Sequence, residues 1–226
     1  WGAWSVLLSD NGETIVTPMR NAKRDSNNDW VHQIIALDVS AYQAPGEGYV
    51  VGDPVITEWL DEAVQLGDAL PDPTLSDDGN ALTADIHTLH ELSGDGKSII
   101  VAHINLSGTG TGGGNEGGKV NVYEWDESSN CGQGGWSQKG DDISVGFYSA
   151  DAFGLAINYD GSIVAVGQPN DAGGKGDTSG HFRALLWNAS SNCGQGGWET
   201  QEDYIQGPDG LWFAASIALN YDGTII

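Results

Sequence analysis

Hydrophobic and polar positions alternate in short runs along this chain, and most runs come in pairs around a tight turn. Gly154-Leu-Ala-Ile-Asn158 precedes the pair Asp160-Gly161, and Ser162-Ile-Val-Ala-Val-Gly167 follows it. Alternation over a few residues is typical of a half-buried β-strand, and an Asp-Gly or Asn-Gly pair readily takes the positive φ angles of a hairpin turn. The pattern therefore predicts β-hairpins, with almost no helical periodicity.

The same hairpin recurs along the chain at intervals of about 60 residues. Asn158-Tyr-Asp-Gly161 returns as Asn220-Tyr-Asp-Gly223, and the segment from Ser128 to Trp136 is identical to the segment from Ser190 to Trp198. The turn glycines of the four copies are Gly12, Gly96, Gly161 and Gly223. A period of this length predicts a tandem array of one structural unit.

Each complete unit holds two further strands after its hairpin and a loop rich in Gly, Asp and Asn. The third strand is predicted at 120–126 and 182–188, and the fourth at 136–143 and 198–205. Four short strands in tandem predict an all-β fold of β-propeller blades. β-Sandwich domains are the alternative, but they are usually nearer 100 residues long. The tryptophans that recur in register are expected to pack between units: Trp125, Trp136, Trp187 and Trp198.

The chain is predicted to be a single propeller segment of about three and a half units over residues 1–226. The units span approximately 1–81, 82–149, 150–210 and, in part, 211–226. The first unit holds an insertion at about 39–60, and one or two helical turns are predicted at 58–66. A closed propeller has about four to eight blades, and bare strand edges favour aggregation. We therefore expect the remaining blades to come from the same or a neighbouring chain.

The chain is strongly acidic, with 8 basic against 32 acidic residues and a formal net charge of −24. Like charges repel, so nucleic acid and anionic membrane are excluded as partners, and other proteins or glycans remain. The simpler interpretation is that Asp and Asn suit turns and keep the surface soluble. No apolar run reaches the length of a membrane span, which argues against direct membrane insertion.

Two features bear on the compartment. The tripeptides Asn105-Leu-Ser107 and Asn188-Ala-Ser190 are glycosylation sequons at strand ends or loops, and they predict an extracellular or cell-surface glycoprotein. Cys131 and Cys193 occupy equivalent places in consecutive units, a blade width apart, which disfavours a disulfide, although the glycine-rich loops around them could stretch to meet. We predict that they are not bonded to each other and pair, if at all, with cysteines elsewhere.

The third unit resembles the FG-GAP repeat of the integrin α-subunit propeller. The resemblance rests on Phe153-Gly154, Asp160-Gly161 and Val164-Ala-Val-Gly167-Gln-Pro169. It implies a propeller of about seven blades, an extracellular location, and adhesion or ligand binding without catalysis. The other units depart from the pattern, since Trp4-Ser5, Thr88-Leu89 and Ala215-Ser216 stand where Phe-Gly is expected.

Many proteins of that family bind calcium in the hairpin loop, which needs several oxygen ligands around one ion. In the third unit Ala156 and Val164 replace the outer ligands, so no cofactor is predicted at the hairpins. The later loop offers a weaker calcium site at Asn170, Asp171 and Asp177, for which a solvated turn is the simpler interpretation.

Catalytic and metal chemistry finds little support in the residues. His87 and His90, with His103 nearby, are three apart, so they face opposite sides of a strand and do not share a metal. The segment from Ser9 to Thr14 loosely echoes the turn motif of sialidase propellers, but its spacing is wrong. The chain also lacks an arginine cluster for a carboxylate, since it has only Arg20, Arg24 and Arg183.

We therefore predict a non-catalytic extracellular propeller that serves adhesion, matrix or surface assembly through its loops, with no catalytic or cofactor-binding residue. Loops vary while strands hold the scaffold, so a binding surface is expected there. Two alternatives stay open. One is a carbohydrate-active, sialidase-like enzyme on the same fold, and the other is a structural subunit of an extracellular filament or large complex.

Overall fold

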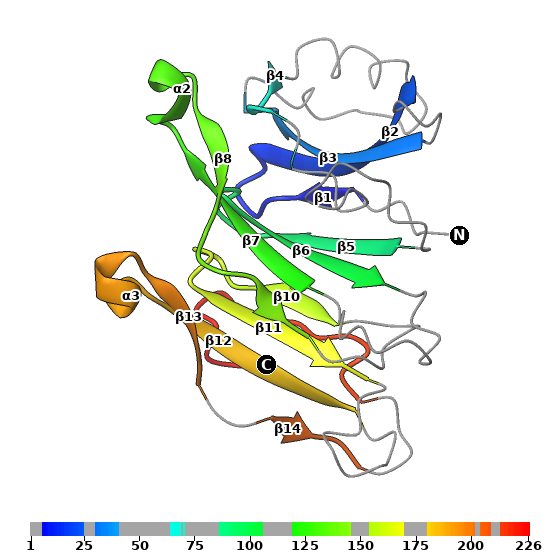
Figure 1. Cartoon of the computed structure of the whole chain (residues 1–226), viewed down its shortest axis with the longest axis vertical. Helices are drawn as coiled ribbons and strands as arrows, with labels where there is room; N and C mark the ends of the chain where they lie inside the picture. Colours follow the sequence, from blue (N-terminus) through cyan, green and yellow to red (C-terminus); the bar gives the residue numbers. More distant parts are fainter. Residues whose placement is uncertain are drawn as a thin grey trace, which may run out of the picture.

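The computed structural model of the chain is all-β, with three antiparallel sheets stacked face to face (Figure 1). It describes residues 6–24, 30–40, 64–68, 70, 86–105, 119–145, 154–169, 180–201, 204–208 and 213–226. The first strands of neighbouring sheets contact one another, β1 with β5 and β5 with β10, so one edge of the stack is shared. We call this edge, formed by β1, β5 and β10, the inner edge.

The first sheet has the order β1-β2-β3-β4. Its strands are β1 (Leu7–Leu8), β2 (Thr14–Arg24), β3 (Trp30–Asp38) and β4 (Val64–Gln65). Leu7 pairs with Val16 in the hairpin, and Leu37 pairs with Gln65 at the outer edge. The helical turns predicted at 58–66 are therefore wrong at their end, where a strand closes the sheet, and residues 58–63 lie outside the described residues.

The second and third sheets share one design. The second holds β5 (Ile86–Leu92), β6 (Ser98–Asn105), β7 (Lys119–Asp126), β8 (Gly135–Gln138) and β9 (Ile143–Ser144). The third holds β10 (Leu155–Ile157), β11 (Ile163–Gln168), β12 (His181–Asn188), β13 (Gly197–Thr200) and β14 (Ile205–Gln206). In each, the predicted fourth strand is broken into two short pieces that both pair with the third strand.

Two apolar clusters fill the spaces between the sheets. Val16, Ile99 and Val101 lie at the centre of the cluster between the first and second sheets, and all are at most 1% exposed. Ile100 and Val164 belong to the cluster between the second and third sheets, and both are fully buried. Consecutive residues of β6, Ile99 and Ile100, thus face opposite neighbours, as the two-residue period of a strand requires.

The identical segments form the same compact turn in both sheets. Each contains a short helix, α2 (Ser129–Gly132) or α3 (Ser191–Gly194), in which the Asn and Cys residues have left-handed φ angles of 51–59°. The Asn130 and Asn192 amides donate to the carbonyls of Gly134 and Gly196, at 2.9 and 3.0 Å, which closes the turn. Hydrophobic periodicity could not predict this turn, because its conformation depends on two consecutive residues with left-handed φ angles.

The recurring tryptophans lie where the repeat predicts, at the outer part of the spaces between sheets. Trp125 and Trp136 have ring centroids 5.4 Å apart, and Trp187 and Trp198 lie 5.2 Å apart. Trp198 Nε1 donates to the Lys139 carbonyl of the second sheet at 2.8 Å. Trp136 Nε1 donates to the Leu66 carbonyl of the first sheet at 3.0 Å. At each of the two interfaces, one tryptophan therefore forms a hydrogen bond to the preceding sheet.

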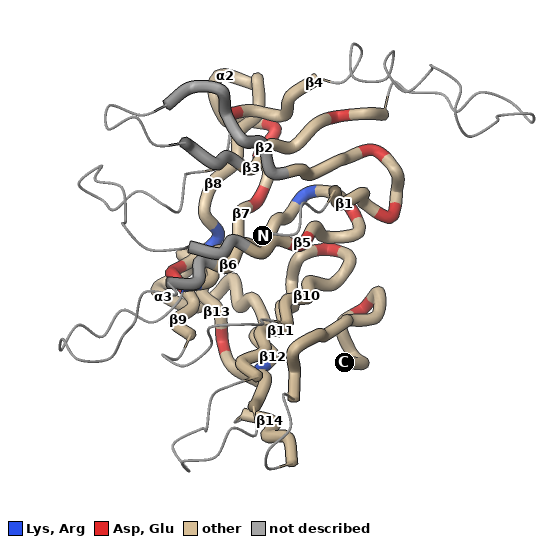
Figure 2. The backbone as a smooth tube through the Cα atoms, turned by 90° about the vertical axis from the view of Figure 1, so that its right-hand side faces the viewer, with Lys and Arg blue, Asp and Glu red and all other residues tan. Residues whose placement is uncertain are grey.

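Acidic positions are distributed along the described strands and turns, while basic ones are few (Figure 2). The most enclosed ion pair joins Lys139 Nζ to Glu124 Oε1 at 2.7 Å, with the lysine side chain 8% exposed. No helix in the described part of the chain has the length and apolar character needed to cross a bilayer.

Candidate functional site

The hairpin turns of the four units lie in a row at one end of the inner edge. Backbone hydrogen bonds join neighbouring turns: Asn11 N donates to Gly94 O at 3.3 Å, and Asp95 N donates to Tyr159 O at 3.0 Å. The third and fourth turns are joined by a bond from Tyr159 N to Tyr221 O at 3.1 Å. The last unit therefore contributes its turn to the row, although no strand is assigned in residues 213–226.

A hollow of about 160 Å³ lies along this row of turns. The repeat explains its lining, since each unit contributes the residue before its turn and the second residue of the turn. We call the hollow the turn pocket. The residues that line it are Leu8, Asp10, Leu92, Gly94, Ile157, Tyr159, Leu219, Asn220 and Tyr221.

Equivalent positions play equivalent roles in the turn pocket. The residues before the turns are all aliphatic, but almost all of the surface that the hollow exposes is polar: Leu8, Leu92, Ile157 and Leu219 are the aliphatic residues. The second residues of the turns differ and give the rim its chemistry: Asp10, Gly94, Tyr159 and Tyr221. The repeat thus builds the scaffold of the site, while the rim residues set its chemical character.

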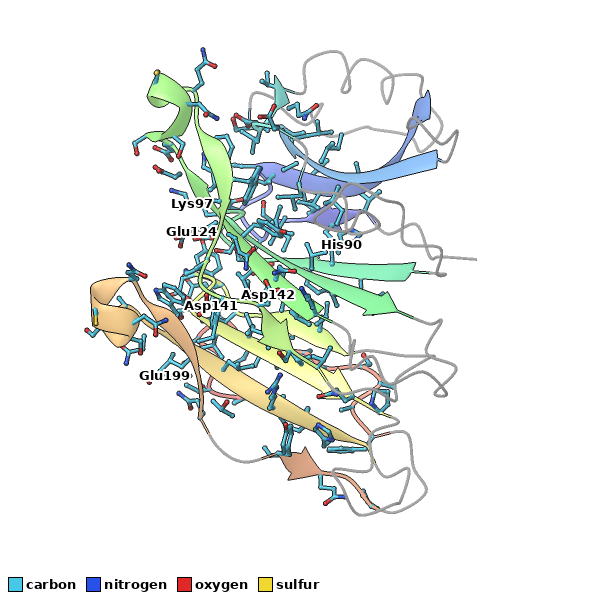
Figure 3. All side chains as sticks on the ribbon, in the orientation of Figure 1. His90, Lys97, Glu124, Asp141, Asp142 and Glu199 are labelled. Atoms are coloured by element: carbon cyan, nitrogen blue, oxygen red, sulfur yellow. The ribbon has the colours of Figure 1, made fainter. Side chains whose placement is uncertain are left out.

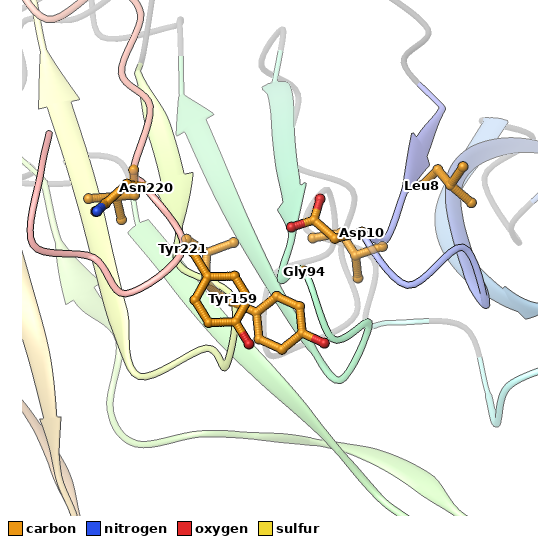
Figure 4. Close-up of a pocket in the computed structure, with 9 residues that line it drawn as sticks. Leu8, Asp10, Gly94, Tyr159, Asn220 and Tyr221 are labelled. Atoms are coloured by element: carbon orange, nitrogen blue, oxygen red, sulfur yellow. The ribbon is translucent and has the colours of Figure 1, made fainter.

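The rim holds a stacked pair of tyrosines. The rings of Tyr159 and Tyr221 lie 4.2 Å apart at an angle of 22°, and Tyr221 is 68% exposed (Figure 4). Next to them a Cβ on Gly94 would come within 2.4 Å of the Tyr159 ring and 2.6 Å of the Asp10 carboxylate. Only glycine therefore lets this carboxylate and ring approach over the second turn.

Most polar side chains of the turns are used to hold the turns themselves. Asp160 Oδ1 accepts from Ser162 N at 3.0 Å, and Asp222 Oδ1 accepts from Thr224 N at 3.1 Å. The Ser162 hydroxyl, which donates to the carboxylate, holds the pKa of Asp160 below its usual value. These aspartates hydrogen-bond within their own turns, and the expectation that the hairpins bind no calcium stays a prediction.

Asp10 differs from the other turn acids. In the described part of the chain its carboxylate forms no hydrogen bond or ion pair, whereas the next residue, Asn11, accepts from Glu13 N at 3.0 Å. Loss of solvation raises the pKa of the Tyr159 hydroxyl, and Tyr221, Asp95 and Asp10 add to the rise. The rim therefore carries negative charge and one carboxylate that a ligand can engage.

Several residues singled out in the sequence lie away from the turn pocket. Asn188 ends β12, where its amide donates to Glu199 at 2.9 Å and its oxygen accepts from Ser190 N at 2.9 Å. Asn105 ends β6. Glycosylation at either residue stays a prediction. Cys131 and Cys193 are free and exposed on α2 and α3, and the calcium candidates Asn170, Asp171 and Asp177 lie outside the described residues.

The histidines singled out in the sequence lie on two neighbouring strands. His87 and His90 both lie on β5, while His103 lies on β6 opposite Thr88. His90 is 6% exposed and lies on the side of β5 that faces the first sheet (Figure 3). Among the described residues, no group of three His, Cys, Asp or Glu side chains is placed to hold a metal ion.

The residue after His90 is a second polar group on the inner edge. Glu91 alternates with Leu92, which packs toward the first sheet, so its side chain lies on the face toward the third sheet. It is half-buried and forms no hydrogen bond or ion pair in the described structure. Burial raises the pKa of its carboxyl above the usual 4.5.

Glu91→Gln is expected to stabilise the protein at pH 7 and to leave stability unchanged near pH 4. Because the folded pKa is raised, the folded state binds more protons than the unfolded state, and wild-type stability falls as pH rises from 4.5 through the folded pKa. The variant lacks this fall. Urea unfolding between pH 4 and 8 measures it, and equal pH profiles for the two proteins would contradict the burial of this charge.

Comparisons with known proteins identify no family. No family model matches the chain, and no curated protein matches it. The resemblance to the FG-GAP repeat therefore stays a prediction. One solved structure with a similar arrangement is a periplasmic gluconolactonase of Pseudomonas aeruginosa, at 14% identity and a TM-score of 0.43. The match covers 91% of this chain and 42% of the gluconolactonase chain, so this chain spans well under half of that protein.

This finding corrects one prediction. The similar structure is an enzyme, which contradicts our expectation that the chain has no catalytic role, and that expectation is not retained. Scattered acids and the lack of an arginine cluster were taken as evidence against catalysis, although neither composition nor fold decides function. A TM-score of this size assigns no activity to the chain.

The turn pocket itself was missed in the sequence analysis. Each hairpin turn was interpreted as a possible calcium loop, in which the first and third residues would be the ligands. The signal lay in the second residue, which is Asp10, Gly94, Tyr159 and Tyr221 in turn. Variation at one position of an otherwise repeated turn could have indicated a site shared by neighbouring units.

Proposed function

We propose that this chain is part of a carbohydrate-active β-propeller and that the turn pocket binds a sugar ring. The observation that carries the proposal is the Tyr159–Tyr221 pair beside the Asp10 carboxylate, in a hollow whose exposed surface is mostly polar. Small-molecule sites are mostly apolar and aromatic, with a few polar groups that orient the ligand. A sugar ring has both an apolar face and hydroxyl groups, which suits the exposed Tyr221 ring beside a mostly polar hollow.

The stacking of the tyrosines favours a flat ligand over a compact cation. Because the rings are 4.2 Å apart and nearly parallel, they cover each other's facing sides, and the outer face of Tyr221 belongs to the more exposed ring. An organic cation is held best by several rings that surround it. A single exposed ring face instead supports one face of a sugar.

The polar groups and the size of the turn pocket agree with a ligand of one ring. The Asp10 carboxylate accepts hydrogen bonds, and it has no partner among the described residues. At about 30 Å³ per water molecule, a hollow of 160 Å³ holds about five waters. A ring hydroxyl that donates to Asp10 while the ring lies on Tyr221 would replace several of these waters.

Tyr221→Ala is expected to weaken sugar binding by about fivefold, because an aromatic contact contributes about 1 kcal/mol. Titration calorimetry with methyl glycosides of neutral hexoses measures the affinity, and choline serves as a cationic probe. Ile225→Ala is the matched control, because Ile225 is 67% exposed but does not line the pocket. Binding of choline but of no sugar would overturn the proposed ligand class.

A second variant tests the pocket without removing a ring. Gly94 has no left-handed φ, so Gly94→Ala leaves the backbone unstrained while its methyl group displaces Asp10 and Tyr159. We expect sugar binding to be lost and the fold to be kept, as judged by circular dichroism.

Release of nitrophenol from chromogenic glycosides by the wild-type protein tests activity. Sugar binding with no turnover of any glycoside would contradict the carbohydrate-active part of the proposal.

Two broader features belong to the same proposal. The stacked sheets with a shared inner edge support a closed propeller, of which the described sheets form consecutive blades. An extracellular location is supported by the two sequons.

A further inference from the structure

The turn pocket has one acid in its lining and no described basic residue that balances it. Among the described residues, Asp10 is the only charged side chain that lines the hollow. The Arg183 guanidinium donates elsewhere, to the carbonyl of Ser144 on the second sheet. The lysines whose side chains the structure describes are all paired with other acids: Lys97 with Glu127 at 3.5 Å, Lys119 with Asp142 at 3.1 Å and Lys139 with Glu124 at 2.7 Å.

The neighbouring turns add to this negative charge. Asp95 Oδ1 accepts from the Ser93 hydroxyl at 2.6 Å and from the backbone N–H of Lys97 at 2.9 Å, so neutral donors hold it and leave its charge in place. The aspartates of the third and fourth turns are held by neutral donors in the same way. The pKa of the Tyr159 hydroxyl, raised by loss of solvation and then by groups that include Asp95 and Asp10, reflects the same field.

The position of Asp10 brings this charge to a ligand of the tyrosine pair. The carboxylate and the Tyr159 ring both border Gly94, where a Cβ would come within 2.6 and 2.4 Å of them (Figure 4). Asp10 is exposed, and its carboxylate accepts no hydrogen bond in the described part of the chain. A sugar that reaches the tyrosines therefore places part of its ring next to a negative charge that no described cation offsets.

This field distinguishes sugars by their charge. An ammonium group on the ring donates a charge-assisted hydrogen bond to a carboxylate, which is stronger than the bond from a hydroxyl. The carboxylate of an acidic sugar is repelled instead. Because Asp10 is exposed to water, the ion pair changes affinity by about three- to fivefold rather than by orders of magnitude.

We propose that the turn pocket selects amino sugars, with the ring against the Tyr159–Tyr221 pair and the ammonium group beside Asp10, and that it disfavours acidic sugars. The inference rests on the proposed sugar site and names the class of its ligand. The repeat gives the reason for this selectivity: of the four equivalent turn positions on the rim, only the first carries an acid.

The test compares methyl glycosides that share one ring and differ in charge. Titration calorimetry of the whole chain at pH 6, where amines of this kind are protonated, uses the methyl glycosides of glucosamine, glucose, N-acetylglucosamine and glucuronic acid. We expect glucosamine to bind about three- to fivefold more tightly than glucose, N-acetylglucosamine to lack this advantage, and glucuronic acid to bind more weakly than glucose. The advantage should shrink in 1 M salt, which screens exposed charges.

Two variants locate the charge that is responsible. Asp10→Asn keeps the size of the side chain and should abolish the preference for glucosamine while leaving glucose binding in place. Glu13→Gln is the matched control, because it removes an equal charge from the same turn but Glu13 does not line the pocket. Glu13→Gln should keep most of the preference.

The outcomes separate this inference from the proposed sugar site. Equal affinity for glucosamine and glucose, or a preference that survives Asp10→Asn, would overturn the selection of amino sugars and leave the sugar site standing. Tighter binding of glucuronic acid than of glucose would do the same. If none of these glycosides bound, the sugar site itself would be wrong, and this inference would fail with it.

Discussion

Gly196→Ala is expected to destabilise the protein by roughly 3 kcal/mol. Two costs add at this position. Gly196 has a φ of +82°, a left-handed conformation that costs an alanine about 1–2 kcal/mol. Its added Cβ would also lie 2.1 Å from the Trp187 ring, so the ring must move out of its place against Trp198.

The same turn provides a matched control. Gly194 has a similar φ of +88°, but no atom lies within 4 Å of a Cβ built there. Gly194→Ala is therefore expected to cost only the conformational part, about 1–2 kcal/mol. Urea unfolding of both variants separates the two costs. Equal losses would show that the contact with Trp187 contributes nothing, and the pair Gly132 and Gly134 repeats the test in the second sheet.

Trp198→Ala is expected to cost about 3–5 kcal/mol, because it removes a large ring from the space between the second and third sheets. Trp198→Phe keeps an aromatic ring but loses the bond from Nε1 to the Lys139 carbonyl, at 2.8 Å, and should cost about 1 kcal/mol. Thermal unfolding by circular dichroism, with urea titration for the free energies, measures both.

The first interface supplies the comparison for this pair. Trp136→Ala and Trp136→Phe should show the same order of effects, since Trp136 donates to Leu66 at 3.0 Å in the equivalent place. If Trp198→Ala lowered the free energy of unfolding by less than 1 kcal/mol, the tryptophan would not stabilise the contact between the sheets as proposed. A phenylalanine variant as unstable as the alanine variant would assign that role to the hydrogen bond rather than to the ring.

Both predictions concern residues of the repeated segments, but only the role of the tryptophans could be predicted from the sequence. Trp136 and Trp198 recur in register, which indicated packing between units, and the structure places them there. The role of Gly134 and Gly196 was not visible, because a glycine in a loop rich in glycine carries no local signal. It depends on the position of a ring from β7 or β12, which tertiary structure alone supplies.

The sequence predicted strands better near the turns than far from them. The hairpins around Asp95-Gly96 and Asp160-Gly161 were correct because turn chemistry and alternation agree there. The fourth strand was predicted as continuous, but its residues between 138 and 143 leave the sheet and return. The strand at Val64–Gln65 was missed because two residues, placed by pairing with Leu37 and Asp38, have no period of their own.

The sequence by itself determined the repeated unit, its turns and the all-β class, because these depend on local periodicity and on residues that accept positive φ. Tertiary structure alone decided which turn residues meet. Asp10, Gly94, Tyr159 and Tyr221 are far apart in the chain, and only the side-by-side packing of their sheets brings them to one rim. The reason is physical: a strand pattern records which side faces a neighbour, but the identity of that neighbour is fixed by the stacking of whole sheets.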